Sequence, residues 1–143
     1  MVTVTAKNLT NSPFDFLDSD NAVVRFPAFG TATGDFTGSQ LDLLNFWIAA
    51  GGFSELNPPV NTVAPVLSGN ENPTVTNGTW VGADTYAYAW EVSEDGEGDW
   101  EVVPDETGTS YNPEMGGFFR VQVTASNDDG SASVYSNVLE VLR

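Results

Sequence analysis

Hydrophobic and polar residues alternate with a period of two in several short stretches of the first 56 residues, which is the pattern of half-buried strands. Residues 2–6 predict one strand. Residues 14–17 and 22–26 predict two more, joined in a hairpin by the polar turn at residues 18–21. Residues 31–33 form a further short extended segment. This part of the chain is therefore expected to be a small β-rich module.

Residues 40–50 form the one segment in which apolar residues follow a helical period. Ser39 is expected to cap its N-terminus, and Asp42 is expected in the first turn, where a negative charge favours the helix dipole. Two glycines at positions 51 and 52 predict its end. The side chains expected on one shared face are Leu41, Leu44 and Ile48.

The second part of the chain begins at residues 57–61, where two prolines predict a short spacer between domains. Beyond it, turn-forming residues recur about every 8–12 residues, as in a β-sandwich, and no helix is expected. The alternation in residues 85–92 directs Trp90 into the core. A second inward face is formed by Phe119, Val121, Val123 and Ala125. These patterns predict a domain boundary between residues 56 and 57.

Charge limits the class of partner. Twenty acidic residues against four basic ones give a formal net charge of −16. We expect neither nucleic acid nor an anionic membrane as a partner, because both require clustered Lys and Arg. The acidity is interpreted first as a solubility feature, with cation binding as the alternative. No stretch approaches the ~20 apolar residues that cross a bilayer. Residues 1–5 lack the pattern of a signal peptide, so we expect no export by such a signal.

The absence of both Cys and His removes several kinds of chemistry. Disulfides, thiolate nucleophiles, imidazole bases and zinc sites of the usual nitrogen and sulfur type are excluded. A hydrolase built on two carboxylates stays formally open, but no pair of carboxylates is marked by its spacing as sharing a cleft. We therefore expect no enzyme, with no catalytic residue, no cofactor and no metal site.

Residues 93–99 are rich in carboxylates and are interpreted as an acidic hairpin turn. A weak cation site is the alternative, although Pro104 stands where the EF-hand pattern requires a glutamate. Among the tryptophans, only Trp100 is considered for an exposed position, which leaves contact with a glycan as a minor hypothesis.

Several segments of the second part resemble the disulfide-free immunoglobulin-like repeats of bacterial surface proteins and tailed-phage structural proteins. These segments are residues 61–69, 78–80, 88–92, 110–113 and 117–127. The resemblance implies a sandwich centred on Trp90, without the cysteine pair of antibody domains. Residues 4–9, 12–16 and 24–30 resemble short N-terminal modules of small phage virion proteins. The expected fold class is therefore mainly β: a small β-rich N-terminal module with one helix at residues 1–56, followed by an immunoglobulin-like β-sandwich at residues 57–143.

Aromatic residues are crowded into the first 56 residues, which hold seven of the nine Phe. A chain this short buries only about 60% of its surface on folding, so some rings are expected to stay exposed and to form an interface. The net charge is −4 in residues 1–56 and −12 in residues 57–143, so the first module is the expected docking end. The candidate docking residues are Phe14, Phe16, Phe26, Phe29 and Trp47.

Together these features predict a non-enzymatic virion structural protein of a tailed phage. We expect a capsid (head) decoration protein that binds the major capsid protein through residues 1–56 and displays the immunoglobulin-like domain on the capsid exterior. Self-association into an oligomer and weak contact of the immunoglobulin-like domain with host-surface glycans stay open. The alternatives are a bacterial cell-surface or secreted carbohydrate-binding adhesion module, and a phage tail component with an immunoglobulin-like appendage.

Overall fold

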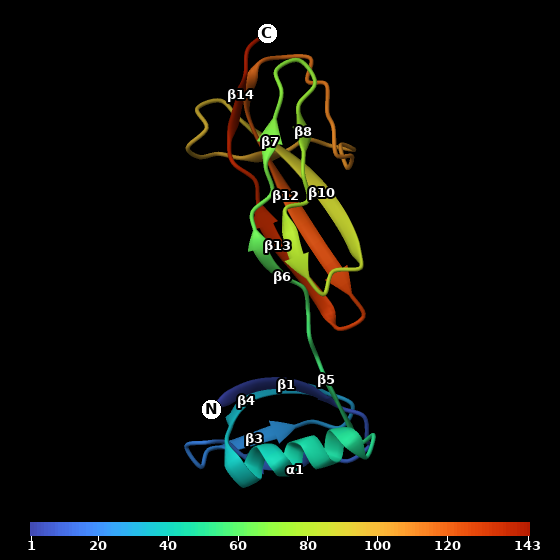
Figure 1. Ribbon diagram of the computed structural model, residues 1–143. Coiled ribbons are helices and arrows are strands. Elements are labelled where there is room, and N and C mark those ends of the chain that lie inside the picture. The colour runs from blue at the N-terminus through green and yellow to red at the C-terminus, as the bar shows by residue number, and fades with distance from the viewer. The chain divides into compact units, whose positions relative to one another are not determined.

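A computed structural model describes all 143 residues, and the chain divides into two compact units, Met1–Asn57 and Pro58–Arg143. Strands contain 47% of the residues and the single helix 8%, so the predicted mainly β class with one helix is confirmed. Figure 1 shows the elements of both units. Each unit is described by itself below.

The first unit is built on a three-stranded antiparallel sheet in which β1 (Val2–Asn8) lies between β4 (Thr31–Phe36) and β5 (Phe53–Glu55). Because side chains alternate across a strand, Val4 and Ala6 of β1 are buried while the residues between them face outward. β2 (Phe14–Leu17) and β3 (Val23–Phe26) form the predicted hairpin, in which each residue of β2 has a partner on β3.

The core of the first unit is largely aromatic. The ring of Phe16 meets those of Phe26 and Phe53 edge to face, with centroids 5.6 and 5.5 Å apart. Edge-to-face contacts add to the stabilisation that burial provides. The buried residues of this core are Val4, Ala6, Phe16, Phe26, Phe36, Leu44 and Phe53. The short unit therefore uses most of its phenylalanines to fill its own interior.

Helix α1 (Gly38–Ala49) covers this core, but the predicted signals at its N-terminus are wrong. The helix begins before Ser39, and Thr37 occupies the N-cap position without a side-chain hydrogen bond. Asp42 lies beyond the first turn, which contains no acidic residue. Helices of this length depend mainly on packing, and here packing takes the place of capping. The predicted face of Leu41, Leu44 and Ile48 packs on the core, and Trp47 of the same helix also packs against it.

The second unit is an antiparallel β-sandwich, in agreement with the immunoglobulin-like expectation. One layer has the order β11-β10-β12-β13, and β14 extends it by pairing with β12. Its strands are β10 (Thr85–Ser93), β11 (Glu101–Val102), β12 (Gly117–Asn127), β13 (Gly130–Tyr135) and β14 (Leu139–Val141). No helix occurs in this unit. The long central strands β10 and β12 run side by side in Figure 1.

The other layer consists of shorter pairs. β6 (Val60–Val63) pairs with β9 (Thr79–Val81), and β7 (Leu67–Ser68) pairs with β8 (Thr74–Val75). A bridge between Thr74 and Ser110 adds a further extended segment to this layer. Figure 1 shows β6 beside β13, where the two layers meet at one edge.

Trp90 lies at the centre of the sandwich and is fully buried. Its indole N–H donates a hydrogen bond of 2.8 Å to the carbonyl oxygen of Gly108, so the polar atom of the ring is satisfied. The predicted inward face of β12 is confirmed, since all four of its side chains are buried. The residues packed together in this core are Leu67, Val75, Trp90, Phe119, Val121, Val123 and Val141.

The predicted spacer at residues 57–61 is wrong in part. Val60 and Asn61 belong to β6, and the side-chain amide of Asn61 donates hydrogen bonds to the carbonyl oxygens of Val63 and Thr79. Pro59 is fully buried. The two prolines lack the backbone N–H that pairs strands, and the spacer was expected for that reason. The chain pairs as a strand directly after them.

Replacing Trp90 with Ala is expected to lower the free energy of unfolding of the second unit by about 3–5 kcal/mol, because the substitution leaves a large cavity in the core. Replacing the exposed Val102 with Ala is the control and is expected to change that free energy by less than about 0.5 kcal/mol. Denaturant titration of the intact chain, followed by the amide NMR signals of β12, measures both values. An unchanged midpoint for Trp90→Ala would contradict the core assignment.

Candidate functional site

One apolar surface in the first unit is not covered by the rest of the unit. Phe46 is 63% exposed, and Leu43, one helical turn earlier, is also exposed. Trp47 is half-buried and packs against Phe14 of β2, with ring centroids 5.1 Å apart. We call Phe14, Leu43, Phe46 and Trp47 the aromatic surface. Because Phe14 also meets the buried Phe53 at 5.6 Å, this surface is a continuation of the core.

The structure divides the five predicted docking residues into three groups. Phe16 and Phe26 are in the core, so the prediction that they dock is wrong: their rings face Phe36, Phe53 and each other. Phe14 and Trp47 belong to the aromatic surface. Phe29 is 60% exposed, but no ring contact joins it to that surface.

Phe46 is exposed but is not among the predicted docking residues. Its signal was present in the sequence, since Leu43, Phe46 and Trp47 form a second apolar stripe at helical spacing. Of this second stripe, Trp47 also packs against the core, whereas Leu43 and Phe46 are exposed.

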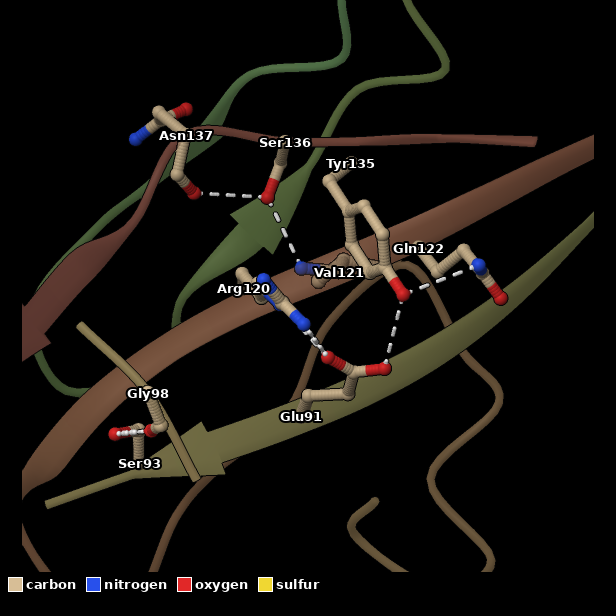
Figure 2. Close-up of polar contacts among 9 residues, drawn as sticks. All are labelled: Glu91, Ser93, Gly98, Arg120, Val121, Gln122, Tyr135, Ser136 and Asn137. Atoms are coloured by element: carbon tan, nitrogen blue, oxygen red, sulfur yellow. Dashed lines mark hydrogen bonds and ion pairs between the residues drawn. The ribbon is translucent and has the colours of Figure 1, made fainter. Parts of the chain in front are cut away.

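A polar cluster occupies the outer face of the five-stranded layer in the second unit (Figure 2). Glu91 of β10 lies directly opposite Arg120 of β12, and both alternate with the inward-facing Trp90 and Val121. The Arg120 Nε and Nη2 atoms lie 2.7 and 2.6 Å from Glu91 Oε2. The side chains are 11% exposed for Glu91 and 24% exposed for Arg120. This ion pair is therefore shielded from solvent far more than a surface pair.

Two aromatic rings enclose the guanidinium of Arg120. Its Cζ atom lies 4.2 Å from the ring centroid of Trp100 and 4.1 Å from that of Tyr135. The Tyr135 hydroxyl donates to Glu91 Oε1 at 3.4 Å, and the amide of Gln122 donates to the Tyr135 oxygen at 3.3 Å (Figure 2). Each ring thus has the guanidinium against its π system, and Trp100 is half-buried rather than exposed.

The acidic residues predicted to form a turn do connect β10 to β11. Asp95 Oδ1 accepts hydrogen bonds from the backbone N–H groups of Glu97 and Gly98 at 2.9 and 3.2 Å. The Ser93 hydroxyl lies within hydrogen-bond distance of both Asp95 Oδ1 and the Gly98 carbonyl oxygen. These donors, the Glu97 N–H foremost, then the Gly98 N–H and the Ser93 hydroxyl, hold the pKa of Asp95 below its usual value.

No family model, curated protein or solved structure matches this chain. No three side chains of the types that bind metals gather at a single point. The one helix is too short to cross a membrane.

Asp95 is expected to titrate below the usual aspartate value of about 3.9. Its folded-state pKa is depressed, so the turn's hydrogen bonds are complete above that value and are lost as the pH falls through the folded-state pKa. Carboxyl NMR titration of the intact chain measures the midpoint, and Ser93→Ala is expected to raise it by removing one donor. A midpoint at or above the usual value would show that the turn does not hold the carboxylate.

Replacing Arg120 with Met is expected to lower the free energy of unfolding by about 2–3 kcal/mol, because Glu91 then keeps a shielded charge without a cation beside it. In a Glu91→Gln background the same replacement is expected to cost on the order of 1 kcal/mol. Denaturant titrations of the four proteins complete the cycle. Equal costs in the two backgrounds would mean that the pair is not energetically coupled.

Proposed function

We propose that the protein is a non-enzymatic structural component of a tailed-phage particle, a capsid decoration protein. In this proposal the first unit docks on the protein shell through the aromatic surface, and the second unit is carried on the particle's exterior. The observation that carries the proposal is the exposed aromatic stripe of α1, which the fold leaves without a partner. The sequence resemblances to phage virion modules favour the particle as the setting.

The aromatic surface has the properties of a protein-binding site. Trp and Phe are enriched at the centres of interfaces. Trp47 and Phe14 are held by ring contacts to each other and to the core, so little side-chain entropy is lost when they are covered. Phe46 extends from this fixed base, with its ring centroid 5.9 Å from that of Trp47. A partner that covers Phe46 would therefore meet a largely preformed surface.

Charge favours a foreign protein as the occupant. Nucleic acid and anionic lipid are repelled by a chain of net charge −16. A second copy carries the same charge, so self-association also brings like charges together. The surface of another protein has neither disadvantage. A shell made of many identical subunits also offers one such surface per subunit, so many copies can dock in equivalent positions.

The adhesion alternative depends on aromatic rings that can stack on a sugar. Trp100 and Tyr135 are the aromatic residues of the polar cluster, and Arg120 lies against both rings. A sugar would have to stack on the remaining faces or displace the guanidinium from its ion pair with Glu91. This arrangement favours docking through the first unit over glycan binding through the second.

Replacing Phe46 with Ser is expected to reduce binding to particles that lack this protein by about tenfold or more, as for a central interface residue. Phe29→Ser is the matched control, because the same residue type is exposed to nearly the same extent outside the aromatic surface. Co-sedimentation of each labelled, intact protein with the particles measures the effect.

Neither substitution removes a buried side chain, so the folded fraction of both variants is expected to stay unchanged. Loss of binding for Phe29→Ser alone would move the docking surface to that residue. Failure of the unmodified chain to bind any particle would remove the decoration role and favour adhesion.

A further inference from the structure

The second unit contains a groove that neither the core nor the polar cluster explains. Two adjoining hollows of ≈ 600 and ≈ 360 Å³ lie against the loop at residues 113–116; the acidic turn at residues 93–99 lines the larger one, and residues 101–104 line the smaller one. Both are lined by Val92, Glu101 and Met115, so they are two parts of one depression, here called the groove. Each hollow has the size of a typical ligand site.

The bottom of the groove is apolar. Phe119 is buried there, and Val92 and Tyr111 are half-buried and pack on the core of the sandwich. Met115, which is 78% exposed, stands where the two hollows meet. A flexible methionine at such a position adapts to different apolar groups. The groove therefore offers a hydrophobic surface to whatever enters it.

The rim of the groove is acidic and contains no base. Five exposed carboxylates line the two hollows, and none of them forms an ion pair. The two arginines of this unit do not neutralise them: Arg120 is paired with Glu91, and Arg143 donates to Asn112 Oδ1 and to the carbonyl oxygen of Glu71. The rim carboxylates are Glu94, Asp95, Asp99, Glu101 and Glu114.

The negative potential extends into the groove. The pKa of the Tyr111 hydroxyl is raised, first by burial and then by the charges of Glu106 and Glu114. An occupant of opposite charge would lower the energy of every one of these carboxylates. Charge complementarity thus selects a cation.

One wall of the groove is a free strand edge. β11 is the last strand of its layer, and its residues Glu101 and Val102 both line the depression. The outer edge of such a strand can accept an extended segment through backbone hydrogen bonds. A peptide can use this edge, whereas a simple amine cannot.

We infer that the groove binds a basic, extended segment of another protein. The aliphatic stems of its Lys or Arg side chains pack on Val92 and Met115, and their charged ends reach the rim carboxylates. The backbone of the segment lies along β11. This binding site is independent of the aromatic surface, so it does not require the docking role proposed above.

The test uses the intact, isotope-labelled chain and a heptapeptide of alternating Lys and Val that begins and ends with Lys, acetylated and amidated at its ends. Titration at physiological ionic strength is expected to shift the amide signals of Val102, Gly116 and Gly117, which lie along the groove. Replacing Glu94, Asp99 and Glu101 by their amides is expected to weaken the peptide's affinity about tenfold, the combined effect of three exposed ion pairs.

A second triple variant separates the groove from the general charge of the protein. Glu71→Gln, Asp84→Asn and Asp128→Asn remove the same charge at exposed positions outside both hollows, and the affinity is expected to change less than about twofold. Met115→Ser, at an exposed side chain, is expected to weaken the peptide without changing the fold.

Spermine carries the same number of amines as the peptide has lysines but has no peptide backbone. It therefore tests whether binding requires the peptide or only its charge. The inference is overturned if spermine binds as tightly as the peptide, if both triple variants lose affinity equally, or if the signals along the groove do not shift. Weaker binding of spermine, with losses confined to the groove variants, supports a site for a basic segment.

Discussion

The antiparallel pairing of β10 with β12 determines where the main features of the second unit lie. Trp90 lies opposite Val121 and faces inward, while Glu91 lies opposite Arg120 and faces outward. One register therefore builds both the hydrophobic core and the shielded ion pair. A slip of one residue would exchange these two faces and bury the ion pair at the centre of the sandwich. Both the hydrophobic face and the polar face therefore disfavour a register shifted by one residue.

The first unit is short, so its stability must come from a small core. It fills this core with phenylalanine rings, which bury a large area per residue and meet edge to face. The rings on β2 continue outward from the core to α1, so the aromatic surface and the core share Phe14. The stability of this unit and its exposed apolar area are therefore linked, because the side chains that form its aromatic surface are in contact with those that form its core.

The parts of the fold that depend on neighbouring residues could be predicted from the sequence. The alternation around Trp90 and the hairpin of β2 and β3 are local patterns, and both were predicted. The exposure of Phe46 could not be predicted from a local pattern. It depends on which of the two apolar sides of α1 meets the sheet, and the helix sequence alone does not distinguish them. The groove escaped prediction for a similar reason, because a turn and a loop far apart in the chain form it.

Each of the three arginines binds groups within its own unit, and this affects the charge of the folded chain. Arg25 pairs with Asp15 across the hairpin, Arg120 pairs with Glu91, and Arg143 binds polar groups of its own unit. Few cations are left to offset the remaining carboxylates, so the folded chain is a polyanion. Added salt should stabilise it by screening this self-repulsion. The repulsion between two copies extends about 8 Å at physiological ionic strength, and it sets a minimum distance between neighbours on any surface that they share.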